Sequence, residues 1–151
     1  IMQKIVVIAL CLGMSAPVVA AGFKEVSRDG RYVEYQGDLR LSGRFERQQD
    51  SITLDWRGDR VCFYPDAVPA KLLPRVFPTN KPAMFCFSNT RTAINALGLP
   101  PEPPEGACGM IGTATVSISR YVVENGMGET YDLATFVSAE NVSTLKPVPC
   151  P

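Results

Sequence analysis

The amino-acid sequence predicts a mainly β, antiparallel fold with one short helix. From Tyr32 onward the chain alternates between apolar and polar residues, a pattern typical of half-buried strands. Five prolines between residues 65 and 82 exclude a long helix or a central strand there, and helical spacing of apolar residues is confined to residues 91–97. The length of 151 residues allows one domain with a hydrophobic core and is too short for two.

The first 21 residues have the pattern of a secretory signal peptide. The positive charge of Lys4 precedes an apolar run over residues 5–14, and small residues lead up to Ala21. The apolar run is shorter than the roughly 20 residues needed to cross a bilayer. We expect cleavage near Ala21, which leaves residues 22–151 as a single domain, without a membrane span, in the periplasm or outside the cell.

Four of the five cysteines lie in this domain, at Cys62, Cys86, Cys108 and Cys150. An even number of cysteines in an exported chain predicts disulfides. The chain has no C-x-x-C spacing and no histidine, so we expect neither a metal site nor an activated thiol. Cys62 and Cys86 each lie in a short aromatic segment, and we expect these segments to be adjacent strands with the two cysteines facing each other. Cys108 is then left to pair with Cys150.

The first long strand is expected over residues 32–46, with its apolar residues on one face. Gly37 and Gly43 fall in the same series and are candidate positions for a bend or bulge. Turn residues then separate two further alternating segments, residues 52–56 and residues 61–64. The three segments predict an antiparallel meander.

The middle of the chain is expected to be irregular over residues 65–82, with one short turn near residues 70–73. A compact buried strand follows at residues 84–87. Asn89 or Thr90 can then cap a short helix over residues 91–97, whose apolar stripe consists of Ala93, Ile94 and Leu97.

Gly98 ends this helix, and the remaining chain predicts a hairpin. Alternating residues over 114–123 form its first strand, and residues 131–142 form its second. The proline-rich tail after residue 146 carries Cys150, which we expect to hold it against the domain.

These elements together predict a small antiparallel Greek-key barrel of five to six strands, with the short helix before the last hairpin. This order resembles the oligonucleotide/oligosaccharide-binding (OB) architecture, which has five strands and a helix between the third and the fourth. The chain has one strand more, and the resemblance concerns the architecture alone. A β-sandwich is the alternative.

Composition and charge exclude several classes of function. The 15 basic and 15 acidic residues give zero net charge, whereas nucleic-acid binding depends on a positive groove. The lack of histidine removes the usual general base and the Ser-His triad. The positions of Asp55, Asp59 and Asp66 are typical of exposed strand or turn residues. A hydrolase that uses carboxylates alone needs two of them facing one cleft, and these positions do not favour that arrangement. We therefore expect no enzyme activity, no metal and no cofactor.

We interpret the domain as a binding module for a protein of the cell envelope, as an inhibitor or an immunity protein would be. In OB barrels, ligands meet the face of the second and third strands and the loops that join strands one to two and four to five. Arginine and tyrosine are frequent interface anchors. The candidate partner-binding residues at these positions are Arg57, Arg60, Tyr64, Arg120, Tyr121, Asn125 and Met127.

The alternative function is binding of an oligosaccharide or a peptidoglycan fragment, with Trp56 or Tyr64 as a stacking platform. Trp56 shares the parity of Ile52 and Leu54, which favours a place in the core for its ring. A glycan site would need an exposed aromatic ring on the floor of a groove, whereas a protein site would need exposed arginine and tyrosine side chains.

Overall fold

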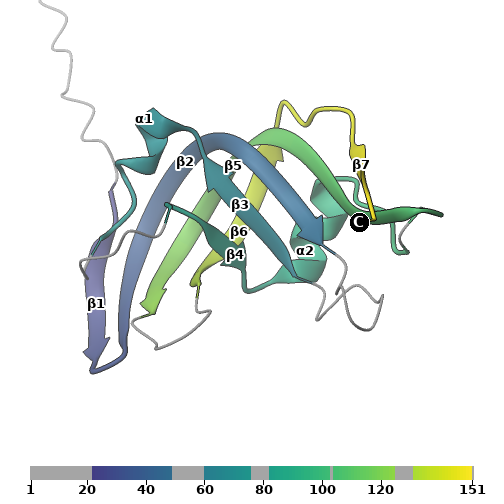
Figure 1. The fold of residues 1–151 in the computed structure, drawn as a ribbon. Helices are drawn as coiled ribbons and strands as arrows, with labels where there is room; N and C mark the ends of the chain where they lie inside the picture. Colours follow the sequence, from purple (N-terminus) through teal and green to yellow (C-terminus); the bar gives the residue numbers. More distant parts are fainter. Residues whose placement is uncertain (1–21, 49–59, 76–81, 103, 125–130, 151) are drawn as a thin grey trace, which may run out of the picture.

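A computed structural model describes residues 22–48, 60–75, 82–102, 104–124 and 131–150. The fold is mainly β, as predicted, and consists of one strongly curved sheet of seven strands with two short helices (Figure 1). The strands are β1 (Lys24–Asp29), β2 (Tyr32–Gln48), β3 (Val61–Pro65), β4 (Phe85–Phe87), β5 (Ala107–Glu124), β6 (Asp132–Glu140) and β7 (Lys146–Pro149), and the helices are α1 (Ala67–Ala70) and α2 (Thr90–Ala96).

Five of the strands pair in a ring. β2 pairs with β3, β3 with β4, β4 with β6, β6 with β5, and β5 returns to β2. The β4–β6 pair is parallel and the other four pairs are antiparallel. β1 extends the sheet beside β2, and β7 extends it beside β5. β2 and β5 are the two long strands of the ring, and their arched course in Figure 1 gives the sheet its curvature.

The predicted alternation along β2 is confirmed. Val33, Leu41 and Phe45 are fully buried, and the polar residues of the opposite parity are exposed or half-buried, except Glu46, which is buried. At Gly37 the φ angle is +148°, and the register of β2 against β5 shifts between Gln36 and Leu39. A glycine therefore accommodates the irregularity in β2, as the sequence predicted for this position.

Gly43 serves close packing instead of a bend. The register of β2 is continuous there, and a Cβ atom at Gly43 would overlap the Tyr64 carbonyl oxygen and lie 2.8 Å from the Pro65 Cα. A Cβ atom at Gly112 on β5 would overlap the ring of Phe45 in the same way. These two positions let β3 approach β2 and let the Phe45 ring lie over the backbone of β5.

The predicted meander is wrong. β2 and β3 pair directly and antiparallel, with Arg44 opposite Tyr64. In a three-stranded meander the first and third strands run parallel and are separated by the second. β2 and β3 would be the first and third strands, and their direct antiparallel pairing leaves no place for a strand between them. That segment, residues 52–56, lies outside the described residues. Period-2 alternation identifies a strand, but it carries no information about which strand pairs with which.

The sequence did not predict the two edge strands. All six residues of β1 are exposed, and β1 joins β2 through a tight turn at Gly30, whose φ angle is +24°. β7 contains Pro147 and Pro149, which an edge strand tolerates because one side of its backbone needs no hydrogen bonds. A strand that lies outside the core has no buried face, and so it leaves no alternation in the sequence.

Aromatic residues fill the interior of the ring. The Phe87 and Phe136 rings meet edge to face with centroids 5.2 Å apart, and Phe85 packs against both Phe63 and Phe87. Ala93 and Leu97 of α2 complete this core, so the predicted helix stripe is confirmed. Gly98 follows the helix with a φ angle of +67°, as expected for a C-terminal stop.

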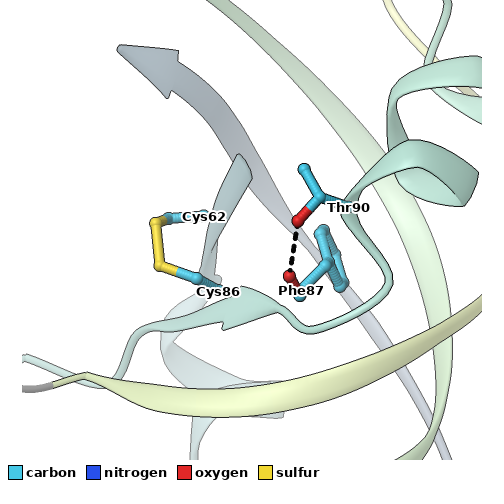
Figure 2. Close-up of a disulfide and its surroundings, with 4 residues drawn as sticks. All are labelled: Cys62, Cys86, Phe87 and Thr90. Carbon is cyan, nitrogen blue, oxygen red and sulfur yellow. Dashed lines mark hydrogen bonds between the residues drawn. A yellow bond between two sulfur atoms is a disulfide. The ribbon is translucent and has the colours of Figure 1, made fainter. Parts of the chain in front are cut away.

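Both predicted disulfides are confirmed. Cys62 and Cys86 lie directly opposite each other on β3 and β4, and Figure 2 shows the bond that joins the two strands. Cys108 and Cys150 join the beginning of β5 to the end of β7. Each disulfide therefore fastens a short strand to its neighbour.

Asn89 precedes α2, as predicted, but its side chain does not cap the helix. Its Nδ2 donates to the Phe136 carbonyl oxygen and its Oδ1 accepts from the Phe136 N–H, each at 2.8 Å. The preceding Ser88 donates its backbone N–H to the Ala134 carbonyl oxygen at 2.9 Å. The parallel β4–β6 pairing thus continues past Phe87 through a side-chain amide. No helix of the described residues is long and apolar enough to cross a membrane.

Candidate binding surface

The outer face of β3 carries a stacked pair of polar side chains. Val61 and Phe63 point into the core, so Cys62 and Tyr64 lie on the opposite face. The Arg44 guanidinium lies over the Tyr64 ring, with Cζ 4.5 Å from the centroid. This distance is typical of a cation–π contact.

Glu46 sets the orientation of the Arg44 side chain. Arg44 Nη1 lies 3.0 Å from Glu46 Oε2, and Glu46 is 7% exposed. Burial, and secondly the nearby Glu46 carboxylate, raise the pKa of the Tyr64 phenol above its usual value, while Arg44 acts in the opposite direction. Tyr64 therefore remains a neutral hydrogen-bond donor at physiological pH.

A second stack of the same kind lies at the beginning of β3. The Arg60 guanidinium lies 4.3 Å from the centroid of the Tyr131 ring. Arg60 immediately precedes β3 and Tyr131 immediately precedes β6. The connections between β2 and β3 and between β5 and β6 therefore meet at their last residues. We use the name β3 face for Arg44, Arg60, Cys62, Tyr64 and Tyr131.

An open hollow of about 370 Å³ adjoins the β3 face beside Arg44. Ile111 of β5 contributes its apolar part, and Lys146 of β7 contributes a second cationic side chain. The Thr113 N–H donates to Ser143 Oγ at 2.8 Å, which holds the β6–β7 connection against β5. The residues that line the hollow are Arg44, Ile111, Gly112, Thr113, Ser143, Thr144 and Lys146.

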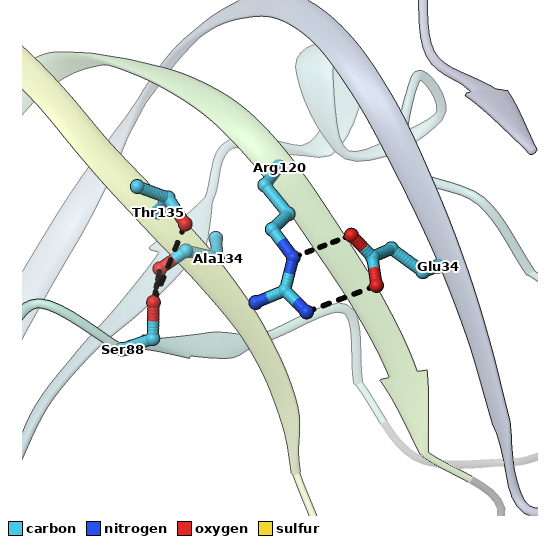
Figure 3. A network of polar contacts seen from close by, with 5 residues as sticks. All are labelled: Glu34, Ser88, Arg120, Ala134 and Thr135. Carbon is cyan, nitrogen blue, oxygen red and sulfur yellow. Dashed lines mark hydrogen bonds and ion pairs between the residues drawn. The ribbon is translucent and has the colours of Figure 1, made fainter. Parts of the chain in front are cut away.

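The candidate residue Arg120 lies away from the β3 face. Figure 3 shows its guanidinium bound to both carboxylate oxygens of Glu34, at 2.6 and 2.9 Å. On β5, Arg120 is opposite Gln36, whereas Thr113 is opposite Arg44. The separation of Arg120 and Thr113 along the strand corresponds to about 20 Å. Arg120 and Tyr64 therefore do not form one surface.

The expectation that Tyr121 is exposed at a partner-binding surface is wrong. Tyr121 lies within β5, opposite Tyr35, and is 1% exposed. Its ring packs against Phe23 and Phe85, and its hydroxyl donates to Asp132 Oδ2 at 2.7 Å. The register of β5 against β6 shifts between Ile118 and Tyr121, and this irregularity lets both side chains point into the core although their parity differs.

Several candidate residues lie outside the described residues: Trp56, Arg57, Asn125 and Met127, and the carboxylates Asp55 and Asp59. The third candidate carboxylate, Asp66, is exposed at the beginning of α1, and its backbone N–H donates to the Ser42 carbonyl oxygen at 2.9 Å. Asp66 thus has the turn role that the sequence suggested.

The structure places Arg60 directly before β3 and Tyr64 within it, and adds three side chains that the sequence did not single out, Arg44, Tyr131 and Lys146. Arg44 belongs to the polar residues in the alternation along β2, and this position was the one feature of the sequence that indicated an exposed side chain there. Across the described ranges, no group of three or more cysteine, aspartate or glutamate side chains could hold a metal ion. The chain matches no protein-family model, no curated protein and no solved structure.

Proposed function

We propose that the protein is a non-enzymatic binding module of the periplasm or the cell exterior whose β3 face binds a protein partner. The observation that carries this proposal is the pair of stacks at 4.5 and 4.3 Å, Arg44 over Tyr64 and Arg60 over Tyr131. Arginine and tyrosine are enriched among the residues that dominate binding energy at protein interfaces. A stacked side chain that is already ordered loses less conformational entropy on binding.

The chemistry of the surface favours an acidic partner. Arg44, Arg60 and Lys146 are cationic, and the carboxylate of Glu46 is largely covered. The hollow beside Arg44 combines the apolar Ile111 with a cationic rim, which suits a leucine or phenylalanine side chain flanked by carboxylates. An inhibitor or immunity protein of the cell envelope would use such a surface to capture an acidic region of its target enzyme.

We further infer that the ring of five strands is an OB-type Greek-key barrel. The ring contains β2, β3, β4, β5 and β6, and α2 lies between its third and fourth members along the chain. In that architecture the ligand-binding face belongs to the second and third strands, which here are β3 and β4. The β3 face lies at this position, and this agreement supports both inferences.

An oxidising compartment is part of the same proposal. The two disulfides are of the kind that forms in exported proteins. The leader-like segment over residues 1–21 provides the route, with cleavage near Ala21. A search for the partner therefore begins with proteins of the cell envelope.

Affinity capture from a cell-envelope extract tests the proposal. The bait is the oxidised protein, in parallel with the double variant Arg44→Ala/Arg60→Ala and the control Arg40→Ala. Arg40 lies on the same face of β2 and pairs with Glu140, so the control also removes an ion-paired arginine. We expect one acidic envelope protein to be retained by wild type and by Arg40→Ala, and to bind the double variant at least about tenfold more weakly, a loss of about 1.4 kcal/mol.

Defined ligands make the assignment sharper. A peptide with a central leucine between glutamates should bind the wild type and should not bind the double variant. The same peptide with lysines in place of the glutamates should bind neither protein. Equal capture by all three baits would reject the β3 face. A glycan-array signal that disappears with Tyr64→Ala, and persists in Arg44→Ala/Arg60→Ala, would instead support the oligosaccharide alternative.

A further inference from the structure

β1 forms an edge of the sheet. Within the described part of the chain it pairs with β2 alone, and its other side presents backbone N–H and C=O groups. All six of its residues are exposed, and Val26 is 51% exposed. An unpaired edge of this kind is a template for a further strand.

The sequence of β1 is complementary in charge to itself. Its residues are Lys24, Glu25, Val26, Ser27, Arg28 and Asp29. When two copies of this strand are set antiparallel about a two-fold axis between Val26 and Ser27, Lys24 meets Asp29 of the second copy. In the same alignment Glu25 meets Arg28. Every charged side chain of the strand then faces the opposite charge.

We propose that β1 pairs with β1 of a second copy of this chain, which continues the sheet across a two-fold axis and forms a symmetric dimer. Most symmetric dimers use one surface patch twice in this way. Opposite charges across antiparallel strands stabilise the pairing, and like charges destabilise it. Charged residues on an edge strand normally prevent it from pairing with another strand. An antiparallel copy of β1 is different, because it presents the opposite charge to each charged residue of β1.

The irregularity in β1 is compatible with this arrangement. The register of β1 against β2 shifts between Glu25 and Ser27, at Val26. The shift therefore falls at the proposed two-fold axis, where the neutral Val26 and Ser27 would meet. The charged residues lie on the regular parts of the strand on either side.

The outer pair of charges offers a clean test, because Glu25 and Arg28 already bond to each other within one copy at 2.8 Å. No described residue bonds to the side chains of Lys24 or Asp29. Lys24→Glu would place the new carboxylate against Asp29 of the second copy, and Asp29→Lys would place two ammonium groups together. Both substitutions leave the intrachain pair of Glu25 and Arg28 intact.

Sedimentation velocity on the purified, oxidised protein measures the outcome. We expect the wild type to dimerise and each single variant to dimerise at least about tenfold more weakly. The double variant Lys24→Glu/Asp29→Lys should dimerise like wild type. An equimolar mixture of the two single variants should form a heterodimer, because each then supplies the charge that the other lacks.

Two results would overturn the proposal: a wild type that remains monomeric at every concentration reached, or a dimer that both single variants form with unchanged affinity. Circular dichroism of each variant confirms that it is folded. The outcome is independent of the proposed function, because Arg44→Ala/Arg60→Ala should leave dimerisation unchanged and Lys24→Glu should leave capture of the envelope partner unchanged.

Discussion

The Tyr121 hydroxyl connects the aromatic core to a carboxylate near the beginning of β6. Asp132 Oδ2 accepts from this hydroxyl at 2.7 Å, and its Oδ1 accepts from the Glu124 N–H at 3.2 Å. Burial, and secondly the charge of Asp132, raise the pKa of the Tyr121 phenol far above its usual value, so the hydroxyl remains a donor at every pH at which the protein is folded. Tyr121 thus fixes the ends of β5 and β6 relative to each other.

Tyr121→Phe should therefore destabilise the fold without affecting partner capture. Removing the hydroxyl leaves a partly buried carboxylate oxygen with one donor fewer, which costs about 1–3 kcal/mol. Urea unfolding measures this loss. Tyr32→Phe is the matched control, because Tyr32 is 43% exposed and should tolerate the change. Equal stability of the two variants would show that the hydrogen bond is not formed in solution.

The Glu34–Arg120 pair should be visible in a pH titration. The hydrogen bonds from Arg120 are the main cause that lowers the pKa of Glu34 below its ordinary value. The stabilisation by this pair is present above the ordinary pKa of an unfolded glutamate and is lost as the pH falls through the lowered folded-state value. Arg120→Ala should raise the pKa of Glu34 toward normal in an NMR titration of its side-chain carboxyl. A pKa that does not change would contradict the pairing.

Individual residues were predictable from the sequence where local parity decides their environment. Arg60 and Tyr64 were identified because they lie at or beside the expected strand over residues 61–64, where OB barrels meet their ligands, and both lie on the β3 face. Arg44 and Tyr131 were missed because their importance depends on which tyrosine or arginine the fold places beside them. Tyr121 was misplaced because a tyrosine suits an interface and a core equally well.

Among the elements, β4 is the shortest strand of the ring, and Asn89 compensates for its length. The Asn89 amide both donates to and accepts from the backbone of Phe136, as a backbone rung of the sheet would. The same residue stands at the first turn of α2. The closure of the ring beside α2 therefore depends on one side chain.

Asn89→Ala should destabilise the protein by about 2 kcal/mol or more, because it leaves two partly buried backbone groups of Phe136 without their partner. Asn89→Asp keeps the acceptor and loses the donor, so it should also destabilise. The control Asn95→Ala changes an exposed asparagine within α2. Thermal unfolding monitored by circular dichroism ranks the three variants, and a melting temperature for Asn89→Ala equal to that of the control would disprove this role.

The strands with one buried face, β2 and β5, were predictable from alternation, and α2 from its apolar stripe. β1 and β7 could not be found in this way, because neither lies against the core. The Asp-Gly pair at residues 29 and 30 is a known hairpin signal and would have indicated the β1–β2 turn. The prolines of β7 argued for a loop, and only pairing at an edge makes them compatible with a strand.

For the whole molecule, the two disulfides should contribute separately. Cys108 and Cys150 are 42 residues apart in sequence, for which the loop-entropy relation gives about 4 kcal/mol. Cys108→Ala/Cys150→Ala should lose most of this stability and release β7, while β2 and β5 keep their slow amide exchange. Hydrogen exchange followed by mass spectrometry distinguishes the two regions. Uniformly faster exchange throughout the chain would show that β7 is part of the global unfolding unit.

The alternation of apolar and polar residues predicted the mainly β class, and the even number of cysteines together with the two short aromatic segments predicted both disulfides. The pairing order was not predictable, because the parallel β4–β6 pair and the β2–β5 pair join segments that are distant in sequence. The expected meander failed because β2 pairs directly with β3, and the alternation over residues 52–56 carried no information about pairing. Local patterns identify strands, and the choice among pairings depends on how the whole set of side chains packs.

The long β2–β5 pairing also has a consequence for the time course of folding. Tyr32 meets Glu124, so β2 cannot complete its pairing with β5 until residue 124 has been synthesised. Proteins dominated by such distant contacts fold in milliseconds to seconds, far more slowly than helical bundles. Until β5 has been synthesised, a nascent chain of this protein therefore leaves the side of β2 that faces β5 unpaired.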